Sequence, residues 1–210
     1  MTDSGKARIR SLALSVCLIL VSVSIVWAGE SRIPDSLIKD IQKLDLGRAG
    51  YRLCYPLSEE QLRKAEEQSL PPTAEGTFRF KDGDLQIVAE KDSNLVILIS
   101  EYHKVWSRKA IKDLVGSFTL GYGFPTTTAH GQTLYWFFSA DGELLDENNY
   151  KDYITQNGNG SVIATIKVQT TSFLRSERDK GKGDGVSSDE PDSGYYLIYS
   201  SPILEMFVKQ

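Results

Sequence analysis

The sequence predicts an α+β fold in which two or three helices pack on one face of an antiparallel sheet. Three observations support this class. Apolar residues recur at helical spacing in three segments, and several shorter segments alternate between apolar and polar residues as strands do. Asp-Gly pairs at 82–83 and 141–142 are typical of the hairpin turns that join antiparallel neighbours. The 210 residues are 40% hydrophobic and 25% charged, which are ordinary proportions for a globular protein.

The first 28 residues are expected to be a secretory signal peptide. Three basic residues precede the uncharged, apolar stretch 11–27, and Ala28 provides the small residue that signal peptidase needs before its cleavage site. The sequence therefore predicts a periplasmic or secreted protein that is cleaved after Ala28, leaving 29–210 as a single α+β domain. The alternative is an uncleaved N-terminal anchor, because the apolar stretch is close to the minimum length of a membrane span.

The first predicted elements of the mature chain are two helices with a short strand between them. Residues 34–46 carry apolar side chains at helical spacing between Pro34 and Gly47. The alternating Tyr-Leu-Tyr pattern at 51–55 predicts a strand. Ser58 and Gln61 form a capping box, so a second helix is expected over 59–68, ending before the prolines at 71–72.

Strand patterns follow at 77–80, 85–89 and 95–99, and the last of these is continuously apolar, as in a central strand. Ser107 is a suitable cap for a third helix that ends at Gly116, followed by a loop rich in glycine and threonine over 117–131. Further strands are expected at 133–138, 162–168, 195–199 and 203–208. Residues 175–194 contain no aromatic residue and many charges, which predicts a mobile surface loop. A calcium site in this segment is the alternative, although the spacing of its acids does not match an EF-hand.

The order of elements after Ser58 and after Ser107 is similar, which suggests a duplicated α-β-β-β unit, with chance as the alternative. Residues 107–145 also resemble the SmpA/OmlA (BamE-type) envelope domain and the related β-lactamase-inhibitor-protein fold. The resemblance lies in the short helix 109–116, the Gly123-Phe124-Pro125 sequence and the strand with Tyr135-Trp136-Phe137. It implies helices packed on one face of an antiparallel sheet and a protein-binding role in the cell envelope. The chain departs from the family in having no convincing lipidation cysteine.

Aromatic residues concentrate between positions 102 and 138, beside the loop 117–131. Because the two faces of a strand alternate, Tyr135 and Phe137 should face one way, and Trp136 and Phe138 the other. One set should fill the core, and the other should be covered by the third helix or should bind a partner. The predicted partner-binding residues are Tyr122, Phe124, His130, Tyr135 and Trp136.

The function predicted from these features is that of a non-enzymatic binding module whose partner is another envelope protein. A pI near 5.3 argues against nucleic acid as the partner. The sequence contains no recognisable catalytic, metal or cofactor motif, so no catalytic residue, metal or cofactor is predicted. The alternative is a small hydrolase or thiol enzyme that uses Cys54, the single cysteine of the mature chain, with His103 or His130. The preferred interpretation of Cys54 is a buried and inert thiol.

Overall fold

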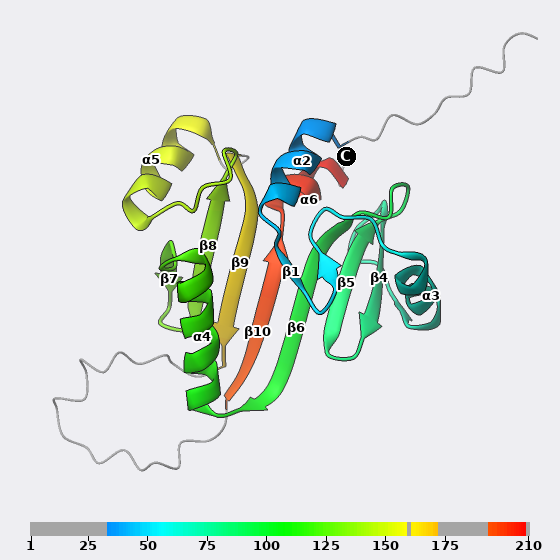
Figure 1. The fold of residues 1–210 in the computed structure, drawn as a ribbon, viewed down its shortest axis with the longest axis horizontal. Helices are drawn as coiled ribbons and strands as arrows, with labels where there is room; N and C mark the ends of the chain where they lie inside the picture. The colour runs from blue at the N-terminus through cyan, green and yellow to red at the C-terminus, as the bar shows by residue number, and fades with distance from the viewer. Residues whose placement is uncertain (1–32, 159–160, 172–192, 209–210) are drawn as a thin grey trace, which may run out of the picture. The chain divides into compact units, whose positions relative to one another are not determined.

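The computed structural model describes residues 33–158, 161–171 and 193–208, which belong to one compact unit (Figure 1). These residues form an α+β fold built on a large antiparallel sheet, as predicted, but with five helices rather than two or three. The helices are α2 (Asp35–Lys43), α3 (Glu59–Glu67), α4 (Arg108–Tyr122), α5 (Glu147–Asn157) and α6 (Pro202–Val208). The strands are β1 (Gly47–Arg48), β2 (Tyr51–Arg52), β3 (Ser69–Leu70), β4 (Thr77–Asp82), β5 (Leu85–Glu90), β6 (Val96–Trp106), β7 (Thr127–Ala129), β8 (Thr133–Ser139), β9 (Val162–Thr170) and β10 (Ser193–Ser200).

Eight strands form one sheet in the order β3-β4-β5-β6-β10-β9-β8-β7, and every pair of neighbours is antiparallel. The sheet therefore consists of two series of consecutive strands, β3–β6 and β7–β10, joined where β6 pairs with β10. A helix precedes each series. Four strands follow each helix, and α5 interrupts the second series, so the duplicated α-β-β-β unit is not confirmed and stays a prediction.

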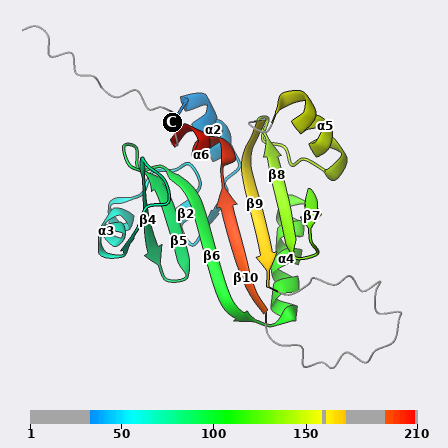
Figure 2. The same cartoon turned by 180° about the vertical axis from the view of Figure 1, so that it is seen from behind.

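One face of the sheet is covered by α2 and α4, and we call it the covered face. Phe118 of α4 packs on Trp136 of β8 and Tyr199 of β10, with ring centroids 5.6 and 6.3 Å apart. Alternate residues of the central strands, among them Ile99 and Leu197, complete this core. Seen from behind, the sheet strands lie in front of α4, which leaves the middle of the opposite face without α2 or α4 over it (Figure 2).

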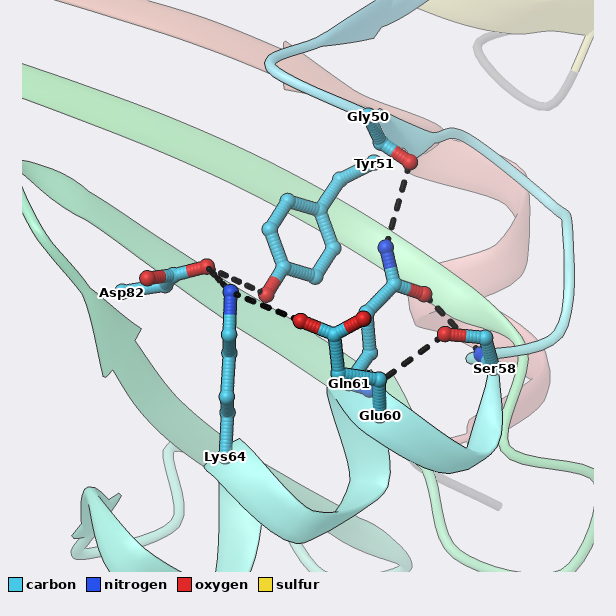
Figure 3. Close-up of polar contacts among 7 residues, drawn as sticks. All are labelled: Gly50, Tyr51, Ser58, Glu60, Gln61, Lys64 and Asp82. Carbon is cyan, nitrogen blue, oxygen red and sulfur yellow. Dashed lines mark hydrogen bonds and ion pairs between the residues drawn. The ribbon is translucent and has the colours of Figure 1, made fainter.

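The capping box at Ser58 forms as predicted and begins α3 (Figure 3). The Ser58 hydroxyl accepts from the Gln61 backbone N–H, and the Gln61 side chain accepts from the Ser58 N–H in return. Lys64, one turn further along α3, donates to Asp82 at the end of β4, and Asp82 also accepts from the Tyr51 hydroxyl at 2.8 Å. These bonds hold the pKa of Asp82 below its usual value, first through Tyr51 and then through Lys64.

Several predicted elements differ from the structure. Helix α4 continues six residues beyond Gly116, and β7 lies inside the segment predicted as a loop over 117–131. Residues 202–208 form helix α6 rather than the predicted strand, and α5 was not predicted. Most of the predicted loop 175–194, including the acids of the alternative calcium site, lies outside the described residues, and its last two residues begin β10. The signal peptide also lies outside the described residues.

Candidate functional site

The structure does not bring the five predicted partner-binding residues together on one surface. Trp136 is fully buried under α4, where its indole N–H donates to the Gly123 carbonyl oxygen at 3.0 Å. The expectation that Trp136 contacts a partner is therefore corrected, and Trp136 is a core residue. Tyr135, its neighbour in β8, points to the opposite face, as the alternation of the strand requires.

The other three residues lie around the end of α4 and the β7–β8 turn. Tyr122 is half-buried and its ring lies 5.9 Å from that of Phe118; burial raises its pKa. Phe124 is 81% exposed just after the helix, near Leu120, which is 91% exposed. His130 is exposed in the turn, with a left-handed φ of 53°. Phe124 and His130 are therefore exposed, whereas Tyr122 packs against the core.

The opposite face of the sheet carries a larger aromatic surface, which we call the open face. It consists of the outward side chains of β4, β5, β6, β10, β9 and β8 that lie away from α4. Tyr102 of β6 and Tyr196 of β10 are directly opposite each other in register, and their rings stack with centroids 4.4 Å apart. Each is 39% exposed, which is unusual for paired tyrosines in the middle of a sheet. Aromatic side chains that are already ordered and partly exposed are well suited to contact a partner.

A second aromatic group lies on the same face, two strands away. Tyr135 and Phe137 of β8 stack with centroids 5.4 Å apart, and Tyr150 of α5 stacks on Phe137 at 4.6 Å. The ammonium group of Lys167 in β9 lies 5.9 Å from the centre of the Tyr135 ring. The ring contacts hold these side chains in place before any partner arrives, so little side-chain entropy is lost on binding.

The open face is basic although the whole chain has a net charge of −4. The strand register places four cations on it, and they are Arg79, Lys81, Lys104 and Lys167. Among the described residues of these strands, the one carboxylate on the same face is that of Glu90. Glu90 already accepts hydrogen bonds from the backbone N–H groups of Asp92 and Ser93. The face therefore presents aromatic rings with cations around them, which fits an acidic partner surface.

The covered face contains a partly buried polar cluster. Glu101 is buried and accepts both hydrogen bonds of the Arg48 guanidinium, at 2.7 and 3.2 Å, and His103 lies 2.6 Å from the same carboxylate. Burial raises the pKa of Glu101, but the hydrogen bonds from Arg48 and His103 outweigh it and leave the pKa lowered. The Glu101 bond likewise raises the pKa of Arg48. This cluster ties β1 to β6.

The thiol and the histidines of the alternative enzyme hypothesis are not neighbours. Cys54 is fully buried, and burial raises its pKa to about 12, so almost no thiolate forms near neutral pH. Its backbone N–H bonds to Val96 at the start of β6, whereas His103 lies seven positions further along that strand, about 23 Å away at strand spacing. His130 follows β7, the edge strand of the sheet, which is four strands away from β6. The structure therefore does not place Cys54 beside His103 or His130, as a catalytic dyad would require.

No family model matches the chain, and no curated protein or solved structure shows a significant similarity to it. Within residues 33–158, 161–171 and 193–208, no three His, Cys, Asp or Glu side chains are grouped so that they could hold a metal ion. The helices in these same ranges include none that is long and apolar enough to cross a membrane. The site is therefore defined by its own geometry.

The Tyr102–Tyr196 pair, which is the centre of the open face, was not predicted from the sequence. Alternation alone places each tyrosine on one side of its own strand. Their meeting depends on the pairing of β6 with β10, which are about ninety residues apart in the sequence. No local pattern specifies that pairing, although an aromatic residue in each of two predicted strands was a visible signal.

Proposed function

We propose that this protein is an exported, non-enzymatic binding module that holds an acidic protein partner on its open face. The observation that carries the proposal is the exposed Tyr102–Tyr196 stack on a sheet face whose described strand residues provide four cations and one carboxylate. Tyrosine and arginine are the residue types that contribute most binding energy at protein interfaces. The resemblance of residues 107–145 to the BamE-type envelope domain supports a partner in the cell envelope. Export rests on the predicted signal peptide 1–28.

A protein partner is favoured over nucleic acid by the character of the surface. The cations are spread over the sheet rather than gathered in a groove that follows a phosphate backbone, and the whole chain is acidic. Electrostatic attraction by this basic face would raise the rate of association with an acidic partner, and that rate would fall with added salt.

Site-specific photo-crosslinking tests the proposal in cells of the native host. A photoreactive phenylalanine is placed singly at Tyr102, Tyr196 and Gln169 on the open face, and at Leu120 and Phe124 as exposed controls. We expect the three open-face positions to capture the same protein, and the two controls to capture none of it. Equal capture from the controls, capture of different proteins from each open-face position, or crosslinks to RNA instead of protein would each contradict the proposal.

A further inference from the structure

A cavity of about 250 Å³ lies at the end of the open face that is next to α6. Its floor includes Val88 of β5 and Leu98 of β6, which are paired in register, and Arg79 of β4 is the next residue in the same row. Thr73 and Ala74 of the loop 71–76 and Glu205 of α6 also line the cavity. The loop is held in place by the Thr77 hydroxyl, which donates to the Ala74 carbonyl oxygen at 2.6 Å. The cavity is therefore bordered by β4, β5, β6, the loop before β4 and α6.

The Arg79 guanidinium borders this cavity with part of its hydrogen-bonding capacity unused. Its Nε atom is buried and has no hydrogen-bond partner within the described residues. Burial of an unsatisfied donor on a charged group costs free energy, so such groups are usually satisfied by another group, a water or a ligand. Because that Nε atom is closed to solvent, a carboxylate in the cavity would accept hydrogen bonds from the two terminal Nη groups of Arg79, which carry parallel N–H donors.

The other residues that line the cavity indicate which chemical groups the ligand has besides a carboxylate. Val88 and Leu98 provide an apolar floor, and Gln86 and Ser100 lie beside it as polar neighbours. The volume corresponds to about eight water-sized groups, which is the size of a six-carbon acid.

We propose that this cavity binds a carboxylate carried on a short apolar chain, with Arg79 as the group that recognises the carboxylate. The carboxylate can come from a small organic acid or from the C-terminus of a protein chain whose last side chain is aliphatic. The cavity shares Arg79 with the basic open face, but it does not include the Tyr102–Tyr196 stack that carries the proposed function.

Isothermal titration of the mature protein with matched probes tests the site. Hexanoate and its neutral amide, hexanamide, have the same apolar chain and differ in the charged group. The peptide Gly-Leu-Val with a free or an amidated C-terminus represents a chain end. The variants are Arg79→Gln and Arg79→Lys, and Lys81→Gln is the matched control because it removes the same charge two residues along the same strand, outside the cavity.

Hexanoate should bind saturably, and Arg79→Gln should weaken it by about tenfold or more, as expected for loss of a charged hydrogen-bond pair. Arg79→Lys should give intermediate affinity, and Lys81→Gln should leave the affinity within about twofold. Tighter binding of the free-ended peptide than of hexanoate supports the chain-terminus source, and the reverse order supports a small acid. Circular dichroism and the unfolding midpoint confirm that each variant folds, and Arg79→Gln should be as stable as the unliganded parent protein.

Any one of three results would contradict the proposal that this cavity binds a carboxylate. They are equal binding of hexanamide and hexanoate, unchanged binding by Arg79→Gln, and no saturable binding of either hexanoate or the free-ended peptide below about 10 mM. Any of these would leave the crosslinking pattern at Tyr102 and Tyr196 unaffected, so the two proposals fail separately.

Discussion

Replacing Trp136 by alanine should reduce the free energy of unfolding by about 3–5 kcal/mol, which is the usual range for removal of a buried tryptophan. Trp136 is 0% exposed, packs against Phe118 of α4 and donates to the Gly123 carbonyl oxygen where α4 ends. The substitution leaves a cavity under α4 and also leaves the Gly123 oxygen without this donor. Urea unfolding, followed by circular dichroism, measures the difference directly.

Tyr135→Ala is the matched control, since it removes a ring from the next residue of the same strand. Tyr135 is half-buried on the open face, so its removal should cost clearly less, about 1–2 kcal/mol. Equal losses for the two variants, or a larger loss for Tyr135→Ala, would contradict the assignment of the two faces of β8.

Glu101→Gln should destabilise the protein by about 2–3 kcal/mol at pH 7, because the buried carboxylate balances the charge of Arg48. The pKa of Glu101 is lower in the folded protein than in the unfolded chain, where a glutamate has a pKa of about 4.3. The stabilisation is therefore fully present above about pH 4.3, and it is lost as the pH falls through the folded pKa. The difference between the parent protein and the variant should shrink toward zero in that acidic range.

The pH dependence is measured from urea unfolding of both proteins between about pH 7 and pH 2.5. The shift of Asp82 has the same sign, but it is present in both proteins and cancels in the difference. Glu143→Gln serves as a control, because Glu143 is exposed and its variant should stay within about 0.5 kcal/mol of the parent at every pH. A Glu101→Gln difference that is constant with pH would show that the carboxylate does not stabilise the fold through its charge.

Elements with a strong local signal could be predicted from the sequence. The capping box at Ser58 and the side-chain cap at Ser107 begin α3 and α4 as expected, because they depend on hydrogen bonds within one turn. The Asp82-Gly83 turn joins β4 to β5 for the same reason, with Gly83 at a φ of 60°. The alternation of β8 also separated Trp136 from Tyr135 correctly.

Where the prediction was wrong, a competing signal was present. Helix α4 continues past Gly116 because Phe118 and Tyr122 extend its apolar side by a further turn, and Gly123, with a φ of 100°, ends it. At the start of α6, the Ser201 hydroxyl accepts a hydrogen bond from the Leu204 N–H, and Pro202 takes the first helical position. This arrangement is typical of the start of a helix and not of an edge strand.

Helix α5 was missed because it is mainly polar. Asp146 nevertheless caps it by accepting from the Asn148 and Asn149 N–H groups, and Tyr150 and Ile154 recur at helical spacing.

The candidate site could be predicted only in part. Tyr135 lies on the opposite face from Trp136 as expected, whereas Tyr102 and Tyr196 come together through the pairing of β6 with β10, which are distant in sequence. Long-range register depends on the packing of the whole sheet, so a single sequence gives little direct information about it. A binding surface was predicted near the end of α4 because its aromatic residues are close together in the sequence.

The central claim is that the open face provides the binding energy for the partner. The most direct test compares the affinities with which two double variants bind the partner that is captured by crosslinking. Tyr102→Ser/Tyr196→Ser removes the stack, and Leu120→Ser/Phe124→Ser removes two exposed apolar side chains elsewhere. We predict that the first variant binds about thirtyfold more weakly or worse, and that the second stays within about twofold of the parent. Unchanged affinity for the tyrosine variant, or an equal loss for both, would contradict the claim.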